Sequence, residues 1–257
     1  MTKFEEMVLR TLAIVLVPVV AGLSLYVNIL WKNSQDASPE SNGYVAPENV
    51  YGVIETVNDL TVSIDCGLNK GSGFAFKLLS DVEADNAIWN FSTNEELQTV
   101  ILTNYHIIES CIGEKLPLRV QFGSGEILNA ELKSLDPDND LAALAVDKKI
   151  DPLYAIWYPI YSGYWVMASG SPLDLKGTVT FGNVINIEGS RIYTSASLNR
   201  GNSGGPLLDN EGYVIGVNTG FRAVAQNINW AIDINALCKK IATCRNNGLI
   251  HPIESEE

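Results

Sequence analysis

The stretch Leu198-Asn199-Arg200-Gly201-Asn202-Ser203-Gly204-Gly205-Pro206-Leu207 sets one serine among three glycines. Glycine adopts backbone conformations that other residues avoid, so this segment can turn tightly and point neighbouring N–H groups into one concavity. Such a concavity can hold an anionic oxygen, with the N–H groups of Gly201 and Ser203 as donors. The same letters also fit an ordinary glycine-rich turn. A nucleophilic role for Ser203 therefore needs a general base elsewhere in the chain.

Histidine is the usual base for a serine nucleophile, and this chain has only two, His106 and His251. His251 stands in the final stretch 248–257, which we expect to be a solvated tail. His106 follows the apolar run Thr99–Thr103, which we expect to be a strand. His106 is therefore the candidate base.

A carboxylate would complete the constellation, because it fixes the tautomer of the imidazole and stabilises its protonated form. Asp140 comes directly before the apolar run Leu141–Val146, so we expect it at the start of a buried strand. Asp136 and Asp138 fit the preceding turn. Aspartates often precede strands, so Asp140 is informative only together with His106 and Ser203.

From about Tyr51 onward the chain alternates short apolar or β-branched runs with Gly, Asn, Asp and Pro. This spacing predicts an all-β protein, built as a sandwich or as a pair of barrels over residues 50–150 and 151–247. A helix should begin at Asp233 and end near Gly248, because apolar residues recur there at helical spacing. The predicted strands include Thr61–Ile64, Gly73–Leu79, Thr99–Thr103, Leu118–Phe122, Leu141–Val146, Tyr164–Ala168, Val179–Ile187, Arg191–Ser195 and Tyr213–Asn218.

Several motifs occur in the order of one enzyme family. They are Gly71-Ser72-Gly73, Thr103–Ile108, Asp140–Leu144, Gly177–Gly182, Leu198–Leu207, Ile215–Thr219 and Asn229–Ile232. By these motifs the chain resembles the chymotrypsin-like serine proteases, and most closely their bacterial HtrA/Deg branch. The resemblance implies two six-stranded antiparallel β-barrels with a C-terminal helix. It places the catalytic cleft between the barrels.

The resemblance also implies a role for each candidate residue. Ser203 is the nucleophile, His106 is the general base and then the general acid, and Asp140 orients the histidine. The loop Gly201-Asn202-Ser203 forms the oxyanion hole. Gly216-Val217-Asn218 offers a strand edge that pairs with an extended substrate, which fits the cleavage of unfolded polypeptides.

The primary specificity pocket can be outlined from the same resemblance. The residue six positions before the nucleophile lies at the base of this pocket, and here it is Ser197 rather than an acid. Leu198, Val217, Ile228 and Trp230 would make the pocket walls apolar. We therefore expect cleavage after small or medium apolar side chains, and not after lysine or arginine.

Some features of the chain depart from the family pattern. HtrA proteins usually carry PDZ domains after the protease domain, whereas only about a dozen residues follow the predicted helix here, so we expect none. The stretch 79–98 is longer than usual and could cover the site, contact a neighbouring subunit or simply decorate the surface. Trimers are usual in the family, so the resemblance also implies a homo-oligomer.

The amino-terminal stretch 11–31 contains no charged residue. As a helix it would be about 30 Å long, which matches the hydrocarbon core of a lipid bilayer. A cleaved signal peptide has a shorter apolar region and ends in small residues, so we expect an uncleaved anchor instead. The few flanking basic residues weakly favour residues 1–10 in the cytoplasm. Residues 32–49 would then form a stalk, and the bulk of the chain would be periplasmic or extracellular.

The chain has four cysteines. The family resemblance implies a disulfide between Cys66 and Cys111, and an extracytoplasmic location permits one. Cys238 and Cys244 fall within the predicted helix, where their Cα atoms would be about 9 Å apart, too far for a bridge. A second disulfide would require the helix to end before Cys244.

Composition excludes several classes of function. The net charge of −13 and a pI near 4.6 argue against a nucleic-acid-binding protein, because phosphate recognition needs clustered Lys and Arg. Scarce histidine and the lack of paired C-x-x-C spacing predict no metal site, and we expect no cofactor. Two alternatives stay open besides a protease: a catalytically silent peptide-binding relative, and an esterase with the same triad. Burst kinetics with an activated ester would exclude the silent relative, and cleavage of unfolded casein would exclude a strict esterase.

Overall fold

The computed structural model describes residues 41–67, 69–78, 87–89, 91–92, 94, 97–155, 159–171, 177–221 and 228–244. Within these ranges no helix is long and apolar enough to cross a membrane. The predicted anchor 11–31, the predicted cytoplasmic end 1–10 and the predicted tail 248–257 lie outside the described residues.

The first half of the described chain folds as an eight-stranded sheet, in the spatial order β6-β5-β1-β2-β4-β8-β7 with β9 beside β2. β9 follows the predicted boundary at residue 150 and pairs in parallel with β2, whereas the other ladders of this sheet are antiparallel. The strands are β1 (Thr61–Cys66), β2 (Asn69–Leu78), β4 (Thr99–Thr103), β5 (Arg119–Gln121), β6 (Ile127–Asn129), β7 (Glu131–Asp136), β8 (Leu141–Val146) and β9 (Leu153–Ala155).

This first sheet differs from the closed six-stranded barrel that the sequence predicted. Strands β6 and β7 lie at opposite ends of the sheet, yet Ala130 alone separates them in the chain. One bent segment therefore supplies both edges, and the sheet curls with no closing ladder among the described residues. At the bend, the N–H of Ala130 donates to the carbonyl of Leu118 at 2.9 Å.

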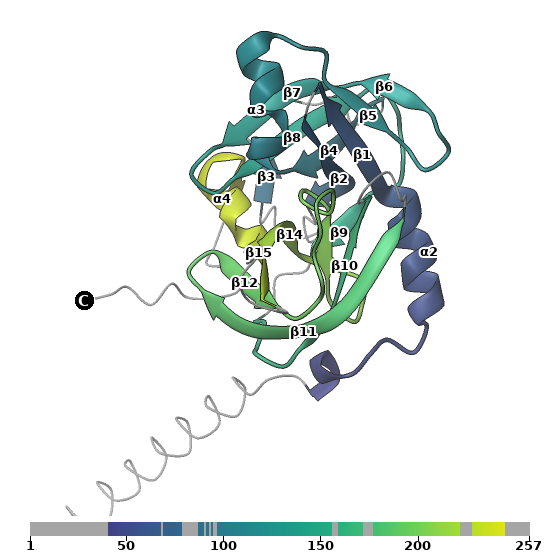
Figure 1. Ribbon diagram of the computed structural model, residues 1–257, viewed down its shortest axis with the longest axis vertical. Coiled ribbons are helices and arrows are strands. Elements are labelled where there is room, and N and C mark those ends of the chain that lie inside the picture. Colours follow the sequence, from purple (N-terminus) through teal and green to yellow (C-terminus); the bar gives the residue numbers. More distant parts are fainter. Residues whose placement is uncertain are drawn as a thin grey trace, which may run out of the picture. The chain divides into compact units, whose positions relative to one another are not determined.

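The second half is a closed six-stranded barrel in the order β10-β11-β12-β15-β14-β13, as predicted. Figure 1 shows it in green, with the long strand β11 running along it. The strands are β10 (Trp165–Gly170), β11 (Thr178–Glu188), β12 (Arg191–Thr194), β13 (Pro206–Leu208), β14 (Val214–Phe221) and β15 (Asn229–Asp233).

The two halves share one hydrophobic core. Phe74 of β2 and Leu102 of β4 belong to the same buried cluster as Met167 of β10 and Val217 of β14. All four side chains are fully buried. Because protein interiors are close-packed, this shared core fixes the loops of one half against those of the other.

A helix, α2 (Val50–Leu60), precedes β1 at the start of the region that the sequence predicted to be all-β. The side chain of Asn49 caps it by accepting a hydrogen bond from the N–H of Gly52 at 2.9 Å. Val53 and Val57 lie one helical turn apart, and both pack on the shared core. The β-branched residues of this helix favour a strand by propensity, and the burial of one face favours the helix instead.

Part of the predicted stalk is packed against the barrel. The short helix η1 (Ser41–Tyr44) brings the ring of Tyr44 edge-on to Tyr164, with ring centroids 4.8 Å apart. Tyr164 is itself buried in the core of the second half. Residues 41–44 are therefore part of the folded unit, in contrast to the free linker that their polar sequence predicted.

The predicted carboxy-terminal helix is much shorter than expected. Asp233 is its cap, as predicted, because its side chain accepts a hydrogen bond from the N–H of Asn235. After η3 (Ile234–Ala236) and α4 (Leu237–Lys240), the chain forms β16 (Ala242–Cys244), which pairs with β3 (Ala87–Trp89). The helix thus ends before Cys244, and a Cys238–Cys244 disulfide forms with Cα atoms 5.4 Å apart.

Candidate active site

His106 and Asp140 are in direct contact. Strand β4 ends at Thr103, and His106 lies in the first turn of the following helix α3 (Tyr105–Glu114). Nδ1 of His106 is 2.7 Å from Oδ2 of Asp140, and the backbone N–H of His106 donates to Oδ1 of the same carboxylate at 2.9 Å. Both carboxylate oxygens therefore hold the histidine, one through the ring and one through the backbone. The His106 side chain is 47% exposed, so a ligand can reach its other ring nitrogen.

A tight turn before β8 presents Asp140 to the histidine. Asp140 has φ of 54°, in the left-handed region, which aspartate tolerates better than most residues. Its N–H donates to the carbonyl of Pro137 at 3.3 Å. The buried carboxylate of Asp136 accepts hydrogen bonds from the N–H groups of Asp138 and Asn139. Asp138 is thus a turn residue, as predicted, whereas Asp136 is the last residue of β7 and caps the turn with its side chain.

Ion pairs attach this turn to helix α4. Nζ of Lys240 lies 2.6 Å from Asp138 and 3.3 Å from Asp136. The hydrogen bond from Lys240 lowers the pKa of the Asp138 carboxyl. In turn, the hydrogen bond to Asp138, followed by the one to Asp136, raises the pKa of Lys240. The carboxyl-terminal helix therefore braces the loop that carries Asp140.

Asn104 links the two halves of the site. Its side chain is completely buried, and its amide nitrogen donates to the carbonyl of Asp140 at 2.9 Å and to the hydroxyl of Thr219 at 3.1 Å. Ser203 in turn donates its hydroxyl hydrogen to the carbonyl of Thr219 at 3.0 Å. A continuous hydrogen-bonded path thus joins Asp140 to Ser203. The sequence motifs include Asn104 and Thr219, but sequence reasoning assigned no role to either.

The loop around Ser203 has the conformation that its glycines allow. Gly201 and Gly204 have φ values of 101° and 85°, which strongly favour glycine. Among the described residues, no group accepts a hydrogen bond from the N–H of Gly201 or of Ser203. The N–H of Asn202, by contrast, donates to the carbonyl of Asn199 at 3.0 Å. Asn202, predicted as part of the oxyanion hole, therefore has no N–H to offer there.

Within the part of the chain that the structure describes, the Ser203 hydroxyl makes no hydrogen bond to His106. A rotation of the Ser203 side chain about its Cα–Cβ bond would break its hydrogen bond to Thr219 and let the hydroxyl donate to another acceptor. In the same described ranges, no group of three or more His, Cys, Asp or Glu side chains is placed to hold a metal ion.

Comparison with known proteins identifies the family. Residues 80–217, more than half of the chain, match the Trypsin-like peptidase domain. The chain belongs to this family. It is 34% identical over 179 residues to the putative serine protease HhoB of Synechocystis, and the match covers 64% of this chain and 38% of HhoB. It is 37% identical over 153 residues to a probable periplasmic DegP-like serine endoprotease of Bartonella henselae, covering 54% and 29% of the two chains.

Solved structures agree with this assignment. The crystal structure of Deg5 superposes with a TM-score of 0.58 at 27% identity, covering 74% of this chain and 90% of Deg5. The serine endoprotease from Yersinia pestis gives a TM-score of 0.59, also at 27% identity, with 76% and 66% covered. The peptidase is therefore of the HtrA type. It spans well under half of the curated relatives named above.

The predicted substrate-pairing residues of this peptidase lie inside the barrel sheet. Gly216 and Val217 of β14 pair with β13 on one side and with β15 on the other. Asn218 is buried, and its amide donates to the carbonyls of Ser169 and Pro206. Residues 216–218 therefore offer no free edge, because strand pairing that cannot be read from local sequence covers both sides. Beyond Asn218, the described ladder with β13 has ended and only β15 pairs with β14.

The residues predicted to form the specificity pocket lie in environments that differ from one another. Ser197 is exposed, and its carbonyl accepts a hydrogen bond from the Thr180 hydroxyl. Leu198 is buried in the core of the barrel, so its side chain is not a pocket wall. Trp230 is half-buried and lies against Gly220, where a Cβ atom would be only 2.3 Å from the indole ring. Trp230 pairs with Gly220 across the β14–β15 ladder, and its indole covers Gly220 on one face of the sheet.

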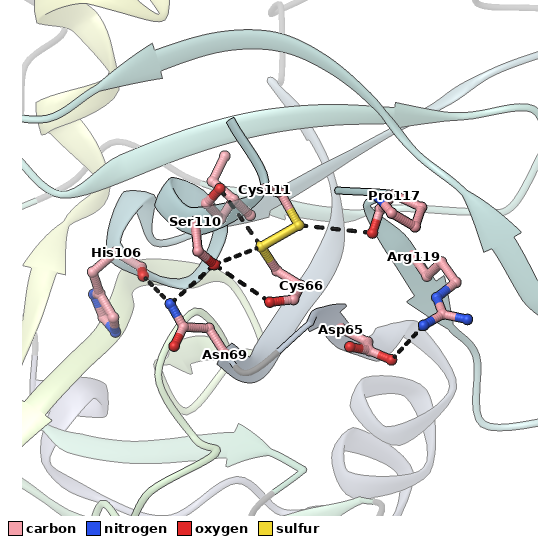
Figure 2. Close-up of a disulfide and its surroundings, with 9 residues drawn as sticks. Asp65, Cys66, Asn69, His106, Ser110, Cys111, Pro117 and Arg119 are labelled. Carbon is pink, nitrogen blue, oxygen red and sulfur yellow. Dashed lines mark hydrogen bonds and ion pairs between the residues drawn. A yellow bond between two sulfur atoms is a disulfide. The ribbon is translucent and has the colours of Figure 1, made fainter. Parts of the chain in front are cut away.

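A disulfide fixes helix α3, which carries His106. Cys66 at the end of β1 is bonded to Cys111 in α3, the pairing that the family resemblance implied. Figure 2 shows Asn69 beside this bridge, where its amide donates to the carbonyl of His106 and to Ser110, each at 3.4 Å. The bridge thus attaches the first turns of α3 to the hairpin of β1 and β2.

Removing this bridge should destabilise the peptidase more than removing the other one. The Cys66–Cys111 bridge closes a sequence separation of 45, and the Cys238–Cys244 bridge closes one of 6. Loop entropy of the unfolded chain predicts losses of about 4 and about 2 kcal/mol respectively for the paired Cys→Ser variants. Urea unfolding measures both free energies. Equal losses, or the reverse order, would contradict an entropic origin.

Proposed function

We propose that this peptidase is a membrane-anchored serine endopeptidase that cleaves unfolded or extended polypeptides outside the cytoplasm. The observation that carries the proposal is the contact of His106 with Asp140, linked through Asn104 and Thr219 to Ser203. The family match supports the same chemistry.

The proposed mechanism begins when the Ser203 side chain turns from Thr219 toward Nε2 of His106. As Ser203 Oγ bonds to the substrate carbonyl carbon, its proton passes to His106, and the carbonyl oxygen becomes an oxyanion. The free N–H groups of Gly201 and Ser203 stabilise that oxyanion. The C–N bond then breaks as His106 gives its proton to the leaving amine. Water then attacks the acyl carbon as His106 takes its proton, and His106 returns that proton to Ser203 Oγ as the acyl C–O bond breaks and the second product leaves.

Asp140 remains ionised through these steps. Its Oδ2 accepts a hydrogen bond from Nδ1–H of His106, which leaves Nε2 unprotonated and ready to act as a base. After proton transfer, the carboxylate stabilises the imidazolium. The bond from the His106 backbone to Oδ1 holds the carboxylate in place throughout.

An extended substrate would pair with β14 beyond Asn218, at residues 219–221. The described pairing partner on that side, β13, reaches only to Val217. Backbone hydrogen bonds at a strand edge recognise extended chains without regard to most side chains. This supports unfolded polypeptides as substrates. Casein should be cleaved by the wild-type chain and left intact by Ser203→Ala.

The pocket should prefer a small or medium apolar side chain before the scissile bond, because Ser197 offers no negative charge and Trp230 limits the space. Introducing a charge should change this preference. We expect Ser197→Asp to raise kcat/KM for a peptide with arginine at that position by roughly tenfold or more relative to its leucine counterpart. Asn199→Asp adds the same charge to an exposed residue nearby. If both variants behave alike, Ser197 does not lie at the pocket.

The membrane anchor, the extracytoplasmic location and the trimer belong to the same proposal. The uncharged stretch 11–31 supports the anchor, and the similarity to a probable periplasmic endoprotease supports a role in extracytoplasmic protein quality control or processing. The full chain should remain with membranes after carbonate extraction, and light scattering in detergent should give the mass of three chains. Release into the soluble fraction would overturn the membrane anchor. A monomer mass would overturn the trimer.

The orientation of Ser203 favours one alternative, a silent relative that binds peptides. Its hydroxyl is bonded to Thr219 rather than to His106. An activated ester distinguishes the two functions, because an enzyme gives a burst equal to the number of sites. A folded chain that binds peptide without a burst would establish the binding function instead.

A further inference from the structure

Ser72, the central residue of the Gly71-Ser72-Gly73 motif, contacts the Ser203 loop from the other half of the molecule. It lies on β2 and is completely buried. Its hydroxyl donates to the carbonyl of Gly201 at 2.6 Å and accepts a hydrogen bond from the N–H of Ser171 at 2.9 Å. Its own N–H donates to the carbonyl of Ser203 at 2.8 Å.

These bonds hold both residues that would form the oxyanion hole. Gly201 and Ser203 are each fixed at the carbonyl oxygen by Ser72, while their N–H groups remain without a protein acceptor among the described residues. The fixed carbonyls belong to the planar peptide groups 201–202 and 203–204, which flank the peptide group that carries the N–H of Ser203, so they limit how that group can rotate. The hydroxyl of Thr103 donates to the carbonyl of Ser72 at 2.7 Å and fixes Ser72 in turn.

The backbones also approach too closely for the loop to move inward. A Cβ atom at Gly204 would lie 2.1 Å from the carbonyl oxygen of Ser72. One at Gly71 would lie 3.0 Å from the carbonyl oxygen of Ser203. The glycines of both motifs are therefore required for this contact, and the loop rests directly on β2.

We propose that Ser72 is a positioning residue that sets the geometry of the oxyanion hole through its hydroxyl group. The assignment rests on the proposed function. It gives the Gly71-Ser72-Gly73 motif, which lies within strand β2, a role in the site. Stabilisation of the oxyanion depends on donors aimed at the place where charge develops, so a small rotation of Gly201 weakens the transition state more than it weakens substrate binding.

The test compares Ser72→Ala with Ser169→Ala in the full chain. Ser169 is equally buried, and among the described residues its hydroxyl bonds to Thr61 and not to the Ser203 loop. Ser72→Ala should lower kcat for a peptide amide by roughly tenfold to a hundredfold, with KM changed less than about twofold. Ser169→Ala should leave both constants near the wild-type values. Ser72→Cys keeps the side-chain shape and a weak hydrogen-bond donor, so its kcat should fall between those of Ser72→Ala and the wild type. This variant replaces Ser72→Ala in the test if the alanine variant does not fold.

A peptidyl boronic acid separates positioning from general loss of structure. Ser203 Oγ adds to boron as its proton passes to His106, and a boron-bound oxygen enters the hole. Its Ki should rise in Ser72→Ala by the same factor as kcat falls, while the Ki of a product-like peptide and the apparent pKa of the kcat/KM profile stay unchanged. The assignment of Ser72 is wrong if Ser72→Ala has the same kcat and Ki as Ser169→Ala, or if the apparent pKa of its kcat/KM profile shifts as its kcat falls. In both cases the wild type remains active, so the proposed function stands. A wild-type chain that neither cleaves the peptide nor binds the boronate contradicts the proposed function, and the assignment with it.

Discussion

His106→Ala should lower kcat/KM for a peptide amide by about 10⁴ to 10⁶. Without the imidazole, no group accepts the Ser203 proton during attack or returns it to the leaving amine. Substrate binding should change little, because in the proposed mechanism His106 exchanges protons with Ser203 and the leaving amine and does not hold the rest of the substrate chain. Steady-state kinetics with a fluorogenic peptide, together with a thermal unfolding curve to confirm folding, measure the effect.

His251→Ala is the matched control, since it removes the other histidine of the chain. Its kinetics should equal those of the wild type. If His251→Ala abolishes cleavage and His106→Ala leaves it intact, the base has been assigned to the wrong histidine.

Asp140→Asn should lower kcat by about 10⁴ near neutral pH, the loss known for the equivalent change in the Ser-His-Asp template. An asparagine can still accept the hydrogen bond from the His106 backbone through Oδ1. Its amide nitrogen would then face Nδ1 of His106 and donate to it, which forces the proton onto Nε2. A histidine protonated at Nε2 cannot act as the base, although the geometry of the site is intact.

Asp138→Asn removes a carboxylate from the same turn. Asp138 is exposed and pairs with Lys240 rather than with the histidine. This variant should retain kcat within about twofold, because an exposed ion pair contributes little. Equal losses in the two variants would mean that the charge of the turn matters, and not the contact of Asp140 with His106.

The candidate residues could be found from sequence because their chemistry leaves few choices. Two histidines, one serine among glycines and one aspartate before an apolar run are local features. Strand β8 begins and ends where the apolar run does. Four strands of the second barrel, β10, β11, β12 and β14, were also predictable as runs separated by turns, and the six-stranded barrel itself followed from the family resemblance.

Features that depend on distant contacts were not predictable in the same way. Helix α2 contains Val50, Val53 and Ile54, whose β-branched side chains favour a strand until the core buries one face. The helix after Asp233 stops early, where β16 pairs with β3 and a disulfide closes. The apolar residues after Asp233 continue at helical spacing, and no residue in the local sequence marks where this helix ends.

Distant contacts also determine features of the candidate site that the sequence could not predict. The residues predicted as a substrate edge are covered by β13, a strand of three residues whose pairing cannot be read locally. Asn104, Thr219 and Ser72 connect the two halves through hydrogen bonds between residues far apart in sequence. Only the fold shows that these small polar residues bond to the segments that carry the candidate catalytic groups.

The most direct measurement is labelling of the full chain with a fluorophosphonate, followed by mass spectrometry of the labelled peptide. We expect one label per chain, located at Ser203, and none in Ser203→Ala or His106→Ala. A label on another residue, or undiminished labelling of either variant, would contradict the assignment of Ser203 as a nucleophile activated by His106. A folded wild-type chain that takes up no label would contradict the proposal of an active serine endopeptidase.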